Sequence, residues 1–141
     1  SIDIKRTKQL ADLSSPLPFT FHRAFDNSKE GPFIALEKII HTGAKRILTS
    51  GRKENAHKGT DLIKSLIEKS NKRIIIMPGA GINTENISEI KELTNAREFH
   101  SSAKKISGRS CNNQNFSKVI NEDYYLSDIQ FIKRMNELIH L

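Results

Sequence analysis

Short apolar runs alternate along this chain with longer segments in which apolar residues recur at helical spacing. Apolar runs bounded by charged or turn residues predict four strands, at 19–22, 46–49, 73–77 and 97–100. Helical spacing of apolar residues predicts a helix after each of the first three strands, over 32–42, from 60 onward and over 84–93. A strand–helix unit that repeats after 24 to 27 residues is typical of a parallel α/β fold.

The two ends of the chain are predicted as helices. Residues 2–13 have a helical pattern that Pro16 ends, because proline cannot continue the helical hydrogen-bond ladder. The polar residues 103–122, rich in Lys, Ser and Asn, are expected to form a long loop. A last helix from about Ser127 is expected to bury four apolar side chains: Ile132, Met135, Leu138 and Ile139.

The stretch from Arg73 to Ile87 gives the most detailed local prediction. A buried strand leads into a glycine turn at 78–81, and Asn83 is expected to cap the helix that follows. Backbone N–H groups freed at the glycines, with the positive end of the helix, would form a seat for an anion. The alternative is that Gly79 and Gly81 only permit a tight turn. The turn lacks both the GxGxxG fingerprint and the P-loop lysine, so neither a Rossmann nor a P-loop site is predicted.

Polar and glycine residues follow each predicted strand. In parallel α/β sheets ligands bind at the carboxyl ends of the strands, so we expect these residues to share one crevice. The candidates for catalysis are His22, Arg23, Asp26 and His100. The candidates for binding an anion or phosphate are Ser50, Gly51, Gly79, Ala80, Gly81, Ser101 and Ser102.

Each of these side chains has a defined chemical use and a structural alternative. Arg23 could hold an oxyanion in bidentate fashion, and His22 or His100 could transfer a proton near neutral pH. Asp26 could pair with Arg23 or orient a histidine. The alternatives are that each histidine only hydrogen-bonds the fold and that Arg23 and Asp26 form an ion pair that orders their loop. No CxxC or HxxxH pattern is present, so the sequence itself requires no metal or other cofactor.

Composition narrows the class of protein. A length of 141 residues indicates one domain or part of one, and no apolar run is long enough to span a membrane. The net charge of +7 comes from Lys and Arg scattered along the chain without interleaved aromatic residues, which disfavours a nucleic-acid interface and leaves a general attraction for anions. The single cysteine, Cys111, cannot form an internal disulfide, so we expect a reducing, cytoplasmic location. A first residue other than Met is taken as the sign of a fragment or processed product.

The four strand motifs together resemble the CutC copper-homeostasis family. The motifs, in order, are residues 19–26, 46–51, 75–81 and 97–102. The resemblance covers nearly the whole chain and implies a TIM-type (β/α)8 barrel. By this resemblance residues 1–141 are the C-terminal half of that barrel, with four parallel βα units, a C-terminal helix and the first four strands absent.

The family resemblance implies a part in copper homeostasis, with copper as a possible ligand. Soft Cu(I) prefers sulfur, and the family's cysteine-containing motif is not present here. Only Cys111, Met77 and Met135 supply sulfur, so copper binding by this chain is expected to be weak or indirect.

The residues also support an alternative function and an expectation about partners. The alternative is a TIM-barrel enzyme for a small phosphorylated or carboxylated molecule, because the loops after the last two strands of such barrels often hold phosphate. The 79–81 turn and Arg23 would hold the anion, with His22 or His100 as acid or base. Half a barrel has two open strand edges, which predicts either a homo-oligomer or pairing with a missing N-terminal half.

Overall fold

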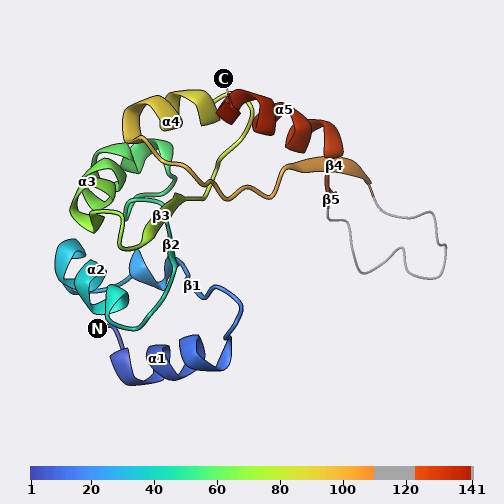
Figure 1. Cartoon of the computed structure of the whole chain (residues 1–141). Coiled ribbons are helices and arrows are strands. Elements are labelled where there is room, and N and C mark those ends of the chain that lie inside the picture. The colour runs from blue at the N-terminus through green and yellow to red at the C-terminus, as the bar shows by residue number, and fades with distance from the viewer. Residues whose placement is uncertain (110–122, 141) are drawn as a thin grey trace, which may run out of the picture.

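A computed structural model describes residues 1–109 and 123–140 (Figure 1). The helices and strands alternate along most of the chain. In order they are α1 (Ile4–Leu13), β1 (Thr20–Phe21), the 3-10 helix η1 (Arg23–Phe25), α2 (Pro32–Ile40), β2 (Arg46–Thr49), the 3-10 helix η2 (His57–Gly59), α3 (Thr60–Ser70), β3 (Ile75–Pro78), α4 (Ile87–Thr94), β4 (Lys104–Arg109), β5 (Asp123–Ser127) and α5 (Ile129–His140).

The first three strands form a parallel sheet in the order β1–β2–β3. Thr20, Arg46 and Ile75 lie side by side in register. The predicted fourth strand is reduced to one parallel bridge between Gly79 and His100. The chain reaches β3 only at its carboxyl end, where His100 N–H donates to the Pro78 carbonyl at 2.9 Å. The predicted parallel direction is therefore confirmed for all four segments, but the length of the last strand is wrong.

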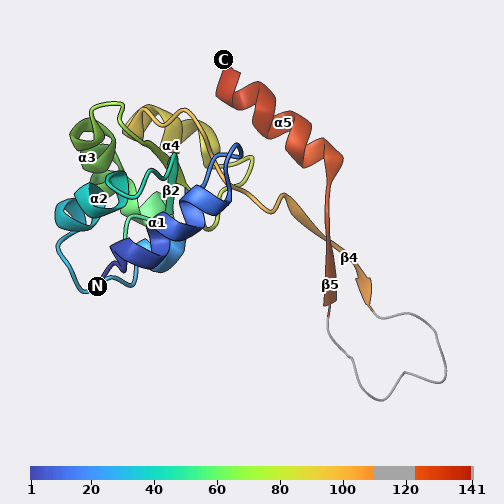
Figure 2. The same cartoon turned by 60° about the horizontal axis from the view of Figure 1, so that its bottom comes forward.

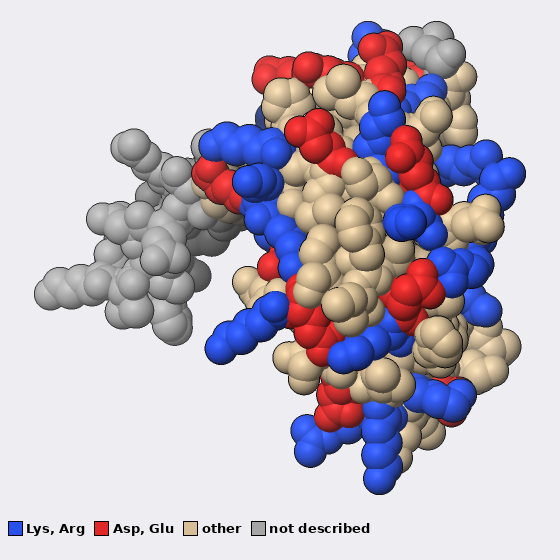
Figure 3. Space-filling model, turned by 90° about the vertical axis from the view of Figure 1, so that its left-hand side faces the viewer, with Lys and Arg blue, Asp and Glu red and all other residues tan. Residues whose placement is uncertain are grey.

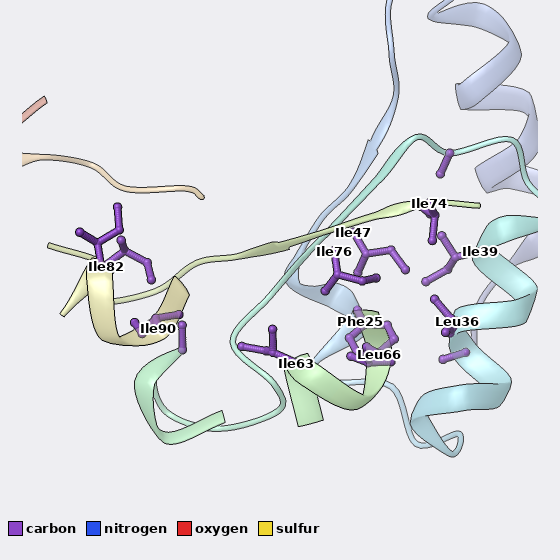
Figure 4. Packing of buried hydrophobic residues seen from close by; sticks show 14 of the residues in the cluster. Phe25, Leu36, Ile39, Ile47, Ile63, Leu66, Ile74, Ile76, Ile82 and Ile90 are labelled. Atoms are coloured by element: carbon purple, nitrogen blue, oxygen red, sulfur yellow. The ribbon is translucent and has the colours of Figure 1, made fainter. Parts of the chain in front are cut away.

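The core lies between the sheet and the helices α2, α3 and α4, which cover one face (Figures 1 and 4). Ile47 and Ile76 point from β2 and β3 into this core and are almost completely buried. The strand before the glycine turn was predicted to be buried, and this is wrong for one of its faces, because Ile75, on the opposite face of β3 from Ile76, is 37% exposed. The helices α2, α3 and α4 leave that face free, so the sheet is closed by them on one side and open at Ile75 on the other.

The chain between β3 and α4 differs from the predicted helix start. Asn83 Oδ1 accepts from the N–H groups of Glu85 and Asn86, and Asn86 Oδ1 accepts in return from Asn83 N–H. These reciprocal bonds stabilise a turn over 83–86, because short amide side chains compete with the helical ladder for backbone groups. The helix α4 therefore begins at Ile87 and not at residue 84.

Part of the predicted 103–122 loop is a β-hairpin. β4 and β5 pair in antiparallel fashion, with Lys104 opposite Ser127. The polar composition of 104–109 hid a strand whose partner lies outside the parallel sheet. The remaining loop residues, 110–122 with Cys111, lie outside the described residues. Figure 2 shows the hairpin projecting away from the helices and the parallel sheet.

The last helix is confirmed in type but not in its full buried face. α5 begins at Ile129. Asp128 Oδ1 caps it by accepting from the backbone N–H of Gln130 at 2.7 Å. Met135 is buried and Leu138 and Ile139 are half-buried, as predicted, whereas Ile132 is 45% exposed. Across the described parts of the chain, no helix is both long and apolar enough to cross a bilayer.

Charges of both signs are interspersed on the helical face of the molecule. In Figure 3 the Lys and Arg side chains alternate with Asp and Glu around an uncharged central area. Two ion pairs are Arg73 with Glu37, at 2.6 Å, and Lys58 with Glu54, at 2.6 Å. This face does not carry a continuous basic patch.

Candidate functional site

A cavity of about 610 Å³ opens at the carboxyl ends of the parallel strands. Its volume is in the range usual for small-molecule sites, roughly 300–1,000 Å³. Its lining comes from the start of η1, from β2, from the turn after β3, from His100 and the segment after it, and from α5. The lining residues are Arg23, Leu48, Ala80, Gly81, Ile82, Asn83, Thr84, Glu85, His100, Ser101, Ser102, Ala103, Lys104, Phe131 and Met135.

Arg23 is held in place by two protein groups. Its Nε donates to the Asp26 carboxylate at 2.9 Å, and its Nη2 donates to Ser50 Oγ at 2.9 Å. Within the described residues no hydrogen-bond partner is found for Nη1. The guanidinium is therefore anchored on one side while its side chain, 44% exposed, lines the cavity. Both predicted uses of Arg23, loop-ordering ion pair and cavity cation, are compatible with this position.

Asp26 lies beneath Arg23 and not in the cavity lining. Its side chain is only 6% exposed. Its carboxylate accepts from Arg23 Nε, Thr49 Oγ1, Ser50 N–H, Ser50 Oγ and Arg52 N–H. Burial by itself raises the pKa of Asp26, but the donors, led by Thr49 and Arg23, outweigh it and hold the pKa below the ordinary value of 3.8. A charged carboxylate with this many donors positions Arg23 and the end of β2.

The two candidate histidines have different positions. His22 Nδ1 accepts from Ala24 N–H at 3.0 Å, which caps the short helix η1, and His22 does not line the cavity. An accepting Nδ1 leaves the proton of the neutral ring on Nε2. His100 is exposed and lines the cavity beside the glycine turn. Of the two, His100 is the one that lines the cavity together with Arg23.

The glycine turn contributes two of its three candidate residues to the cavity. Ala80 and Gly81 line it, with φ angles of 82° and 77° in the left-handed region. Gly79 does not line it. A Cβ on Gly79 would lie 2.4 Å from Leu48 Cδ1 and 3.3 Å from His100 Cβ, so a side chain there would require the end of the Leu48 side chain to move.

The predicted anion seat at the start of the helix is partly occupied by the protein itself. The N–H groups of Asn83, Glu85 and Asn86 already donate to side-chain oxygens within the turn. Gly81 O accepts in addition from Asn86 Nδ2 at 2.8 Å. These three N–H groups are therefore not free to bind an anion.

Of the three candidate serines, two line the cavity and one does not. Ser50 and Gly51 are buried and do not line the cavity, and the Ser50 hydroxyl, which donates to Asp26, accepts from Arg23 Nη2. Ser101 lines the cavity, but its hydroxyl donates to the Ile82 carbonyl at 2.6 Å. Ser102 lines the cavity and is exposed.

Sequence reasoning missed four side chains that shape this cavity. Lys104 adds a positive charge and Glu85 a negative one, while Phe131 and Met135 form an apolar wall. The helical pattern of 129–140 predicted the helix that carries the last two but could not show where that helix packs. Lys104 fell within the predicted loop, where a single lysine gives no signal.

Metal-ligating side chains do not converge in the part of the chain that the structure describes. No group of three or more His, Cys, Asp or Glu side chains there is arranged to hold a metal ion. Met135 is a buried thioether in the cavity wall, and Met77 is half-buried in β3. The donor set of the described residues fits an anion better than a metal.

The fold and the cavity define a parallel α/β protein with its candidate site at the carboxyl ends of the strands. The sequence model of the CutC family matches residues 1–105. The chain belongs to the CutC family, as the four strand motifs predicted.

Similar proteins in other organisms agree with this assignment. A CutC family protein of Parabacteroides distasonis is 47% identical over 105 residues, which are 74% of this chain and 43% of that protein. A CutC family protein of Bacteroides fragilis is 39% identical over 142 residues, 98% of this chain and 56% of that protein. A mouse protein named copper homeostasis protein cutC homolog is 46% identical and covers 73% of this chain and 38% of its own length. This chain therefore spans about half the length of the relatives it matches.

A solved structure matches the fold as well. The crystal structure of a CutC protein from Streptococcus agalactiae aligns with a TM-score of 0.64 and 33% sequence identity. The alignment covers 70% of this chain and 49% of the other. The parallel sheet with its helices is thus an arrangement that this chain shares with a CutC structure.

Proposed function

We propose that this chain takes part in copper homeostasis and that it binds copper weakly or indirectly. Membership of the CutC family supports the first part, together with the name of the mouse relative. The lack of a three-ligand group within residues 1–109 and 123–140 supports the second. A cytoplasmic location is part of this proposal, on the ground of the single cysteine.

A Cu(I) titration against a competing chelator tests this proposal. We expect the chelator to withdraw Cu(I) equally from the wild-type chain and from Cys111→Ser, because no thiolate cluster retains the metal. A Met135→Leu variant removes the thioether that lines the cavity at nearly constant volume. One equivalent of Cu(I) that the wild type retains and either variant loses would contradict weak binding.

We propose as a second function that the cavity binds a small phosphorylated or carboxylated molecule. Arg23 carries this proposal, because its anchored guanidinium lines the cavity together with His100 and Lys104. An arginine whose rotamer is already fixed loses little side-chain entropy when it binds an oxyanion. If the site is catalytic, His100 would be the acid or base and Arg23 the anion clamp, with Asp26 as a positioning residue.

Protection by inorganic phosphate tests the second function. We expect phosphate or sulfate to raise the thermal unfolding temperature, and Arg23→Ala to abolish this rise. Arg6→Ala is the matched control, because Arg6 is an exposed arginine on α1, which lies at the opposite end of the molecule from α5 in Figure 1 and contributes no residue to the cavity lining. Equal protection of the wild type and Arg23→Ala would exclude Arg23 as the anion clamp.

We propose further that residues 1–141 correspond to the C-terminal half of a TIM-type barrel. The shared parallel direction of the four strand segments supports this, as does the placement of α2, α3 and α4 on one face. Coverage of 49% of a solved CutC chain is in keeping with half of such a fold. The open face of the sheet would then be the inside of the barrel.

A further inference from the structure

We propose that the cavity ligand is a phosphate monoester or carboxylate that carries an apolar group of about the size of an aromatic ring. This inference rests on the second proposed function and specifies its ligand. A bare inorganic anion would use only part of the cavity, because the lining is chemically divided. One part is cationic and polar and the other is apolar.

The polar part comes from residues that follow β1 and the His100 bridge. Arg23 and Lys104 are positively charged, and His100 adds a further positive charge when it is protonated. Lys104 Nζ lies 4.5 Å from the centroid of the Tyr125 ring, so its ammonium is held at the base of the hairpin by a cation–π contact. Glu85 is the acidic side chain among the lining residues. The resulting small positive balance fits a ligand with one anionic group and disfavours one with two.

The apolar part is contributed mainly by α5. Phe131 and Met135 lie one helical turn apart and line the cavity together with Ile82 and Leu48. Met135 is 7% exposed and is already packed into the core, whereas Phe131 is 40% exposed. Phe131 therefore has apolar surface that a ligand could cover. Burial of such surface is favourable in proportion to its area.

The position of this wall is fixed by the segment that carries the polar groups. Asp128 N–H donates to the Ala103 carbonyl at 2.9 Å, and Ser127 Oγ donates to the Ser102 carbonyl at 3.0 Å. Lys105 Nζ adds an ion pair with Asp128 at 3.4 Å. Asp128 in turn caps α5, so the start of the helix is tied to residues 102–105. Phe131 is therefore held over a cavity whose other side holds Arg23 and His100.

Binding of matched ligands tests the inference. The dissociation constants of inorganic phosphate and phenyl phosphate are measured by calorimetry on the whole chain, with phenol as a third probe. We expect phenyl phosphate to bind on the order of tenfold more tightly than phosphate, since a ring buried against Phe131 adds apolar contact. Phenol alone should bind too weakly to measure.

Two substitutions on α5 assign the effect to the cavity. Phe131→Ala should abolish the preference for phenyl phosphate and leave the constant for inorganic phosphate unchanged. Ile132→Ala is the matched control, because Ile132 is similarly exposed on the same helix but does not line the cavity, and it should retain the preference.

The outcomes separate this inference from the function on which it rests. Equal constants for phosphate and phenyl phosphate, or a preference that survives Phe131→Ala, would overturn the inference while phosphate binding still supports the anion site. No binding of either phosphate compound, or of benzoate as the matched carboxylate, would overturn both.

Discussion

Arg23 donates from Nε to the carboxylate of Asp26 at 2.9 Å, and the two side chains differ sharply in exposure. Asp26 is 6% exposed and Arg23 is 44% exposed. The pair thus connects the buried end of β2 to the open cavity. The carboxylate also accepts from Thr49 and Ser50, so the loop after β1 and the end of β2 share one charged centre.

Asp26→Asn should destabilise the fold and weaken phosphate binding. An amide retains the shape but cannot accept the same set of donors, and the loss of a charged hydrogen-bond acceptor costs about 1–3 kcal/mol. Urea unfolding measures the change. Asp12→Asn is the control, because Asp12 forms an exposed pair with Lys8 at 3.6 Å and should change the free energy of unfolding by less than about 1 kcal/mol. Equal effects of the two substitutions would contradict a special role for Asp26.

Stability should fall in acid partly through Asp26. Its pKa is lower in the folded chain than the value of 3.8 that an ordinary aspartate has, so the unfolded chain binds more protons as the pH falls. The stabilisation is therefore complete above the unfolded pKa and is lost as the pH falls through the lower folded pKa. Other carboxyl groups with lowered pKa values add to this loss: Glu30, Glu37, Glu54 and Asp128.

Urea midpoints between pH 7 and pH 3 measure this loss of stability. The decrease should be smaller in Asp26→Asn than in the wild type, because the variant no longer has this titrating group. Parallel pH curves for the two proteins would show that Asp26 does not contribute.

Neighbouring residues of β3 should differ in their cost of truncation. Ile76→Ala removes a buried side chain of the core, and we expect a loss of about 2–5 kcal/mol. Ile75→Ala removes a side chain that is 37% exposed on the open face, and we expect well under half of that cost. Denaturant unfolding of both variants measures the difference. Similar losses would mean that the open face is covered in solution.

Gly79→Ala should disturb the cavity wall. The added Cβ would lie 2.4 Å from Leu48 Cδ1 and 3.3 Å from His100 Cβ, and such overpacking costs about 1–3 kcal/mol. Leu48 would have to turn, and it lines the cavity, so phosphate protection should also decrease. The double variant Gly79→Ala with Leu48→Ala relieves the contact. If its loss of stability equals the sum of the two single losses, the two sites do not interact.

The open strand edges and the open sheet face should make the chain associate. We propose that its partner is a second copy or a polypeptide that supplies the other half of the barrel, since unpaired strand edges are templates for pairing. Size-exclusion chromatography with light scattering should show a mass that rises with concentration when the chain is alone. Ile75→Lys, which adds a charge to the open face, should reduce that association. A folded monomer at every concentration would contradict the proposal.

The local sequence pattern was sufficient to predict a helix or strand whose bounds depend mainly on its own residues. The strand at 46–49 and the helix that starts at Pro32 were predicted to the residue, because alternation and a proline at the first helical position depend only on local geometry. The start of α4 was missed because Asn83 and Asn86 use the same backbone groups that a helix would use. Amide side chains can either cap a helix or stabilise a separate turn. Only the relative positions of Asn83 and Asn86 decide which of the two forms.

Local sequence patterns could not predict the contacts between segments that are far apart in the chain. Asp26 was chosen as a partner for Arg23, but its bonds to Thr49 and Ser50 connect residues more than twenty positions apart. The strand β4 lay within the predicted loop, because its polar residues show no apolar alternation, and no strand was predicted at 123–127, where β5 lies. The position of Phe131 in the cavity wall was also missed. A helical pattern predicts which face of a helix is apolar, but it does not predict which part of the protein that face contacts.

The sequence by itself determined the order and direction of the parallel strands and their helices, the glycine turn and the family, because periodicity, proline and glycine constrain the backbone locally. Tertiary structure decided that Asp26 lies under Arg23, that His22 stays outside the cavity and that α5 covers one side of it. Those outcomes depend on register and packing between segments far apart in the chain. Such contacts become favourable only when the whole fold brings the segments together.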